Sequence, residues 1–177
     1  MKRFETGTTY SWRPSSAERL LMEQRCWPGE TNGELIERSL RETAAMQATI
    51  SSVSGDGGAF ALYLTKRLAD ALNGRWQGNR VDTLRAVVST WLQAEATDPV
   101  SDPVELKTRL LQRFEPEVPY PAAEVMAEAR LHCSKRQAQV LLHELSVQKQ
   151  VWLKINKGRG IRIQGKNVDS ILLHKQP

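Results

Sequence analysis

The side chains that could perform catalysis or hold a metal are few and scattered. The three histidines have neither the HxxxH nor the HExxH spacing of metal sites, since they lie at His132, His143 and His174. His132 adjoins Cys133, but two adjacent ligands without a second pair favour an ordinary position beside a helix over a metal site. The Gly-rich stretches GDGG and KGRG lack the GK[ST] ending of a phosphate-binding loop. The sequence therefore predicts no catalysis, no metal and no cofactor.

Side chains that could bind DNA are more concentrated. The chain has a net charge of +5, whereas residues 134–177 contain nine Lys or Arg against two acids, which gives this last quarter +7 and leaves −2 for the rest. A basic surface of this kind attracts phosphate backbones and releases their counterions. The sequence thus predicts double-stranded DNA as the partner, with a merely solvated basic tail as the alternative.

Residues 134–147 have the periodicity of a helix that would position part of this charge. Ser134 can cap this helix by accepting a hydrogen bond from a first-turn amide. One face forms an apolar stripe and the other is polar, made of Lys135, Arg136, Gln139 and His143. Residues 151–156 and 160–164 then alternate as two strands, and the glycines at 157–160 favour a turn that joins them as a hairpin.

Two further helical patterns precede this segment, VELKTRLLQRF and AAEVMAEARL, and the proline-rich EPEVPYP separates them. Three helices and a hairpin in this order resemble the winged helix-turn-helix family. The resemblance implies that helix 134–147 reads the major groove and that the hairpin 151–164, the wing, lies along the backbone. The DNA contacts that it implies are Ser134, Lys135, Arg136, Gln137 and Gln139 on the helix, and Lys157, Arg159 and Arg162 on the wing.

Two features depart from that pattern. The HC connection between the second and third helices is very short, and Trp152 stands where the wing begins. Some winged helices bind proteins instead of DNA. A protein-binding or purely structural module is therefore the alternative for this segment.

The N-terminal half contains two stretches with the same outline, a strand-like run followed by two helices. They are TTYSWRPSSAERLLMEQRCWPGETNGELIERSLRETAAM and AFALYLTKRLADALNGRWQGNRVDTLRAVVSTWL, joined by the linker SSVSGDGG. Thr31 and Glu34 have the spacing of a capping box. In the second copy, buried helix faces are predicted from Leu64, Leu68 and Leu72, and from Leu84, Val87, Val88 and Trp91.

This order of elements resembles the ribbon-helix-helix family, whose pattern is matched by Gly29, Thr31, Glu34, Leu35, Ile36 and Leu40. The resemblance implies an intertwined pair of units whose two antiparallel strands read the major groove. The outward residues of the first strand would be Thr9, Ser11 and Arg13. Those of the second would be Ala61 and Tyr63, which are poor base readers. The two copies could pair within one chain as a pseudo-dimer, or one copy could pair with another chain in a homodimer; a plain helical domain is the remaining alternative.

We therefore expect a mainly α chain with short β-ribbons, divided into ribbon-helix-helix-like units at 1–50 and 51–97 and a winged helix with a basic tail at 98–177. The expected function is sequence-specific regulation of transcription of bacterial or mobile-element genes, in the cytoplasm and associated with the nucleoid. The alternative is a partition or relaxosome accessory protein, or an adaptor, whose winged helix binds protein. The chain has no run of 18 apolar residues and begins with MKRFETGTTYSW, so neither a membrane span nor a signal peptide is expected.

Overall fold

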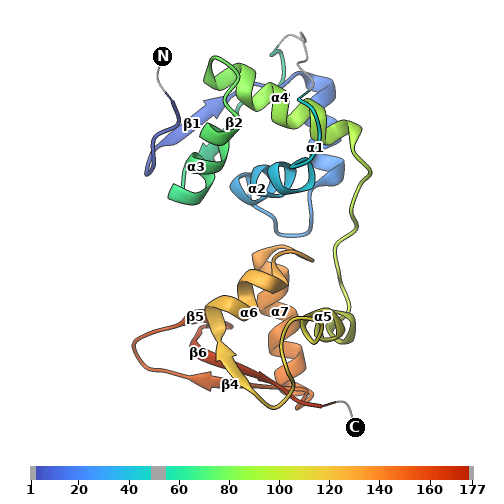
Figure 1. Cartoon of the computed structure of the whole chain (residues 1–177), viewed down its shortest axis with the longest axis vertical. Coiled ribbons are helices and arrows are strands. Elements are labelled where there is room, and N and C mark those ends of the chain that lie inside the picture. Colours follow the sequence, from blue (N-terminus) through green and yellow to red (C-terminus); the bar gives the residue numbers. More distant parts are fainter. Residues whose placement is uncertain (1–2, 49–54, 176–177) are drawn as a thin grey trace. The chain divides into compact units, whose positions relative to one another are not determined.

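The computed structural model describes residues 3–48 and 55–175 (Figure 1). Within them the chain is mixed α/β rather than mainly α, with seven helices and two small antiparallel sheets. These elements form two compact units: unit 1 comprises the described residues up to Cys26 and Glu30–Thr97, and unit 2 comprises Trp27–Gly29 and the described residues from Asp98 onward. In this described part, no helix has the length and apolar character needed to cross a membrane.

Unit 1 is built from two successive copies of a strand followed by two helices. The first copy consists of β1 (Thr9–Trp12), α1 (Ser16–Arg25) and α2 (Asn32–Glu42). The second consists of β2 (Phe60–Tyr63), α3 (Lys66–Gly74) and α4 (Arg80–Gln93). Apolar residues of both copies form one core, so the segments 1–50 and 51–97 are joined by packing as well as by the chain.

Side-chain caps define where the helices of unit 1 begin. The predicted capping box of Thr31 and Glu34 is confirmed: the Thr31 side chain accepts from the Glu34 amide, and Glu34 accepts from the Thr31 amide. A second box, made by Ser15 and Glu18, starts α1. The predicted buried face of α4 is confirmed, and Leu68 and Leu72 are buried on α3 as predicted. Leu64 is also buried, but it precedes α3, which begins at Lys66.

The two strands of unit 1 pair with each other in antiparallel register. Thr9 lies opposite Tyr63 and Trp12 lies opposite Phe60. Because side chains alternate across a strand, Trp12, Phe60 and Leu62 point into the core while their neighbours point outward. The two copies thus pair within one chain.

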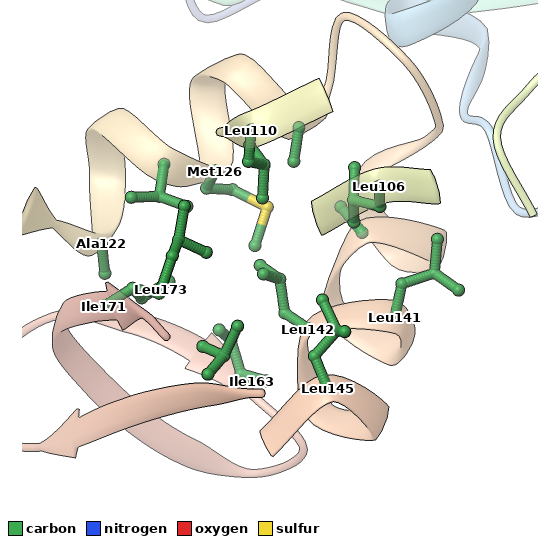
Figure 2. Packing of buried hydrophobic residues seen from close by; sticks show 14 of the residues in the cluster. Leu106, Leu110, Ala122, Met126, Leu141, Leu142, Leu145, Ile163, Ile171 and Leu173 are labelled. Carbon is green, nitrogen blue, oxygen red and sulfur yellow. The ribbon is translucent and has the colours of Figure 1, made fainter. Parts of the chain in front are cut away.

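Unit 2 packs three helices against a small sheet around a single apolar core. The helices are α5 (Pro103–Leu110), α6 (Ala122–Ala129) and α7 (Lys135–Val147). The strands are β3 (Pro119–Pro121), β4 (Val151–Ile155), β5 (Ile161–Ile163) and β6 (Lys166–Leu173). Figure 2 shows side chains from all three helices, among them Leu110, Met126 and Leu142, converging with Ile171 and Leu173 of β6.

The pairing of these strands corrects the predicted hairpin. The sequence predicted that residues 151–156 pair with 160–164, but β4 and β5 both pair with β6, with β4 opposite its C-terminal half. The tight turn lies at Gln164 and Gly165, which both have positive φ (48° and 78°), as a two-residue hairpin between twisted strands requires. Residues 156–160 form a loop between β4 and β5. The central strand of the sheet, β6, lies in the segment that the sequence predicted to be a basic tail.

A proline-rich strand was also missed. The EPEVPYP stretch was predicted only to end a helix, yet Pro119–Pro121 pairs with Leu172–Ser170 of β6. Proline cannot donate a ladder hydrogen bond, so it is confined to the edges of sheets, and β3 is an edge strand.

The turn between β5 and β6 provides a test of this topology. Gly165→Ala should lower the free energy of unfolding by about 1 kcal/mol more than Gly158→Ala, because an L-residue is strained at a φ of 78°. Gly158 is a matched control, since a Cβ at either glycine meets no atom within 4 Å and only Gly165 has a positive φ. Urea denaturation measures the difference. Equal effects of the two substitutions would contradict the β5–β6 turn.

Candidate nucleic-acid interface

The outward side of the β1–β2 pair forms a small exposed surface. We call it the ribbon face; its strand residues are Thr9, Ser11, Ala61 and Tyr63, all exposed, and the exposed Arg13 follows directly after β1. The strand register places Thr9 opposite Tyr63 and Ser11 opposite Ala61, so strand residues of both copies share one side. Tyr63 is 62% exposed, far more than a phenol ring that belongs to the core. The structure thus brings together the outward residues that the sequence predicted for the two strands.

Several contacts fix the ribbon from behind and from the side. The Trp12 and Phe60 rings meet edge to face with their centroids 6.3 Å apart. The Asn32 side-chain amide, at the start of α2, donates to the Ala61 carbonyl over 3.0 Å. The Arg80 guanidinium, at the start of α4, lies 4.8 Å from the centre of the Tyr10 ring. The ribbon face is therefore held by the first residues of two helices as well as by the core.

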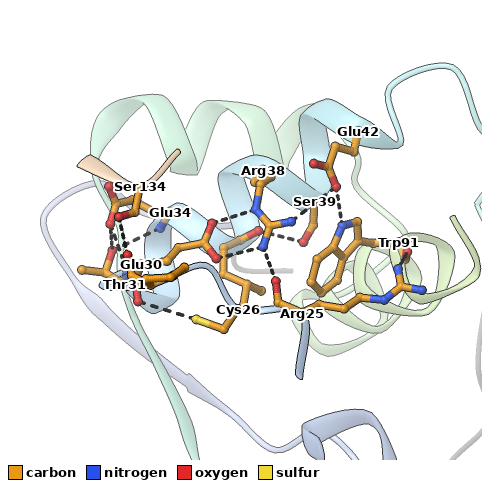
Figure 3. Close-up of polar contacts among 12 residues, drawn as sticks. Arg25, Cys26, Glu30, Thr31, Glu34, Arg38, Ser39, Glu42, Trp91 and Ser134 are labelled. Atoms are coloured by element: carbon orange, nitrogen blue, oxygen red, sulfur yellow. Dashed lines mark hydrogen bonds and ion pairs between the residues drawn. The ribbon is translucent and has the colours of Figure 1, made fainter. Parts of the chain in front are cut away.

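A buried ionic network joins the two copies of unit 1 (Figure 3). Arg38, on α2, is 2% exposed, and its Nε and Nη2 atoms each lie 2.8 Å from a carboxylate oxygen of Glu30. Its Nη2 also donates to the Arg25 carbonyl over 2.8 Å, and its Nη1 lies 3.6 Å from Glu42. Glu42 in turn accepts from the Trp91 indole of α4 over 2.7 Å.

Arginine side chains also cover the Trp91 ring. The guanidinium carbons of Arg38 and Arg25 lie 5.0 and 5.5 Å from the ring centre. Arg25 donates to the carbonyls of Trp91 and Leu92 at the end of α4, over 2.7 and 3.0 Å. These two arginines are therefore committed to packing inside unit 1. This role was not predicted from the sequence. Arg38 lies among the apolar residues of the buried face of α2, and that position could have indicated a buried ion pair.

The residues predicted at the start of helix 134–147 differ in how they are placed. Ser134 is 3% exposed and caps α7 by accepting from the Gln137 amide over 3.2 Å. Gln137 is half-buried, and its Oε1 is enclosed without a hydrogen-bond partner among the described residues. Lys135 and Arg136 are exposed in the first turn of α7. Of these four, only the two cations present their side chains to solvent.

Gln139 links the helix to the sheet. Its side-chain amide donates to the Arg162 carbonyl of β5 over 2.6 Å. The Gln139 amide would need this same donor to bind a base. In this structure it links α7 to β5 instead. Arg162, Lys157 and Arg159 are all exposed, the last two in the loop 156–160.

Unit 2 also exposes apolar side chains that are not explained by its core. Trp152 is 49% exposed and Ile155 is 55% exposed. Trp152 lies opposite Leu172, which lies opposite Pro119 on its other side, so the three form a row across β4, β6 and β3. The alternation within VWLKI could have indicated that Trp152 is exposed. Val151 is buried and Leu153 is partly buried, so Trp152 between them faces the other side of the sheet.

The buried network leads to a prediction about stability. Arg38→Met should lower the free energy of unfolding by about 3–5 kcal/mol, because it leaves the Glu30 carboxylate, 1% exposed, buried without its cation. Arg109→Met is the matched control: Arg109 and its partner Glu105 are about half exposed, and such pairs contribute less than about 1 kcal/mol. Denaturant titration measures both. If both substitutions lower the free energy of unfolding by a similar small amount, the network does not stabilise the fold.

Among residues 3–48 and 55–175, no three His, Cys, Asp or Glu side chains are grouped so that they could hold a metal ion. The predicted contact residues that are exposed carry hydroxyl groups at Thr9 and Ser11 and cationic groups at Arg13, Lys135, Arg136, Lys157, Arg159 and Arg162. No protein-family model, curated protein or solved structure matches the chain.

Proposed function

We propose that this protein is a sequence-specific DNA-binding regulator of transcription, of the kind that acts on bacterial or mobile-element genes. The observation that carries the proposal is the antiparallel β1–β2 pair, which exposes Thr9 and Ser11, is followed directly by the exposed Arg13, and is backed by two strand–helix–helix copies. This arrangement resembles a ribbon-helix-helix dimer contained in a single chain. A two-stranded ribbon has the dimensions of the DNA major groove.

The chemistry of the ribbon face suits an asymmetric site. Thr9 and Ser11 can each donate and accept hydrogen bonds, and Arg13 can pair with both acceptors of guanine. Ala61 and Tyr63 offer apolar surface, which suits a thymine methyl group. Because the two strands differ, β1 makes most of the base contacts, β2 adds apolar contact, and the site has no twofold symmetry.

Unit 2 supports the proposal through its order of elements and its charge. The succession α5, β3, α6, α7, β4 and β6 resembles a winged helix-turn-helix, with the loop 156–160 and the β5–β6 turn in the place of the wing. Lys135 and Arg136 on α7, and Arg159 in the loop, are exposed cations that can neutralise phosphates. Unit 2 in this role supplies affinity that depends little on sequence, and the ribbon supplies base contacts.

The experiment that tests this function is selection from a pool of random duplex DNA at two salt concentrations, followed by sequencing of the retained molecules. We expect an enriched motif without twofold symmetry that persists at the higher salt concentration. Retention without a motif would reduce the function to nonspecific binding. No retention at either salt concentration would refute DNA binding.

Two substitutions separate the roles of the units. Arg13→Ala should relax the preference at one base pair, at a cost of about 1–3 kcal/mol for the preferred base. Arg159→Ala should weaken binding to all sequences and reduce the slope of log affinity against log salt by about one. Arg109→Ala, at an exposed position on α5, is the control for loss of charge alone. The proposed division of roles between the two units is wrong if Arg13→Ala weakens binding to all DNA sequences equally.

A second candidate function rests on the exposed apolar row. Pro119, Leu172 and Trp152 lie side by side across the sheet of unit 2, and a partner protein could cover them. In that case the protein is an adaptor or accessory factor of DNA partition or transfer. Failure of the DNA selection, together with normal folding, would favour this function.

A further inference from the structure

A hollow in unit 1 lies between α2 and α3, separate from the residues of the ribbon face. Its volume is about 300 Å³, which is at the lower end for small-molecule sites. Leu40 and Ala71 contribute apolar lining. The charged residues that line it are Glu37, Arg41, Arg67 and Arg75, and we call it the arginine pocket.

Helical spacing explains why three arginines meet there. Glu37 and Arg41 are one turn apart on α2, Arg67 and Ala71 are one turn apart on α3, and Arg75 is the residue that caps the C-terminus of α3. Residues three or four positions apart lie on one side of a helix, so α2 contributes Glu37 and Arg41 to the lining and the other segment contributes Arg67, Ala71 and Arg75. The three arginines and one glutamate leave an excess of two positive charges around the hollow.

The positive charge is only partly matched by the protein. Arg75 donates to the Thr43 carbonyl over 2.7 Å and is thereby held in place. The structure records no hydrogen bond or ion pair for the guanidinium groups of Arg41 and Arg67 with any other described residue. Burial lowers the pKa of Arg41; Glu42 opposes this effect, while Arg38 and Arg67 add to it. Arg41 and Arg67 are both exposed, and an anion between them would offset the repulsion between their charges.

We propose that the arginine pocket binds a phosphate-bearing anion through Arg41 and Arg67, with Arg75 as a fixed third donor. Guanidinium groups present paired donors whose geometry matches phosphate oxygens, and converging arginines suit an anion with more than one negative charge. The phosphate can come from a phosphorylated small molecule or from the backbone of bound DNA. Both sources use the same contacts, and the experiment below distinguishes them.

The first measurement is the melting temperature of the full chain in sodium pyrophosphate, against sodium chloride of equal ionic strength. Wild-type protein should gain on the order of 4 °C or more at a saturating concentration, because a ligand that binds only the folded state stabilises it. Arg41→Gln/Arg67→Gln should lose this gain and bind pyrophosphate at least tenfold more weakly by calorimetry. Neither side chain makes a recorded bond, so the variant should fold.

The control variant removes the same charge outside the pocket. Lys66→Gln/Arg109→Gln changes one exposed cation on α3, adjacent to Arg67, and one on α5 of unit 2. It should keep the pyrophosphate response. If both double variants lose the pyrophosphate response equally, the response reflects general attraction to positive charge, and the proposal is overturned.

The second measurement is the salt dependence of binding to duplex DNA without pyrophosphate. If backbone phosphate occupies the pocket, Arg41→Gln/Arg67→Gln should reduce the slope by about two more than the control variant does. If a small molecule occupies it, the two variants should have equal slopes and only pyrophosphate binding should differ. The proposal itself is overturned if the two variants bind pyrophosphate equally, whatever their DNA slopes. Should the protein bind no DNA, the pyrophosphate comparison decides alone, which keeps this proposal separate from the proposed function.

Discussion

The pairing of β1 with β2 is the constraint on which unit 1 depends. Each strand has four residues, and an isolated two-stranded pair of this length is not stable in water. It exists because Trp12, Phe60 and Leu62 reach into a core that the four helices of unit 1 complete. The same alternation that buries these residues leaves their neighbours on the opposite side. Core packing and the ribbon face are thus two results of one register, since a slip by one residue would exchange them.

The ionic network around Arg38 adds specificity to this packing. Two buried charges are costly to remove from water, and their attraction repays this cost only when the remaining hydrogen-bonding groups are satisfied. Arg38 meets that condition through Glu30, Glu42 and the Arg25 carbonyl, and Glu42 extends the network to the Trp91 indole. An apolar core would tolerate several ways of stacking α2 on α4. The Arg38 guanidinium adds directional bonds to Glu30 and Glu42, and the bond from Trp91 to Glu42 ties the first copy to the second.

Local patterns in the sequence predicted local structure well and distant pairing poorly. The Thr31–Glu34 capping box, the buried faces of α3 and α4 and the alternation of β1 all follow from neighbours a few residues apart. The pairing of β4 cannot be predicted in this way, because residues 160–164 and 166–173 can both form strands. The turn at Gln164–Gly165 pairs β5 with β6, and β4 then also pairs with β6. Among the site residues, burial of Ser134 and the bond from Gln139 to β5 depend on tertiary contacts that spacing along one helix cannot reveal.

The intrachain ribbon also has a genetic consequence. In a symmetric dimer every substitution occurs twice, so a change that improves one strand is imposed on the other. Here β1 and β2 are encoded separately, and Thr9 and Ser11 could drift away from Tyr63 and Ala61 without any requirement for self-complementarity. A single mutation alters one strand and leaves its partner intact. The two strands can therefore be changed independently, and Thr9 and Ser11 already differ in polarity from Tyr63 and Ala61 opposite them.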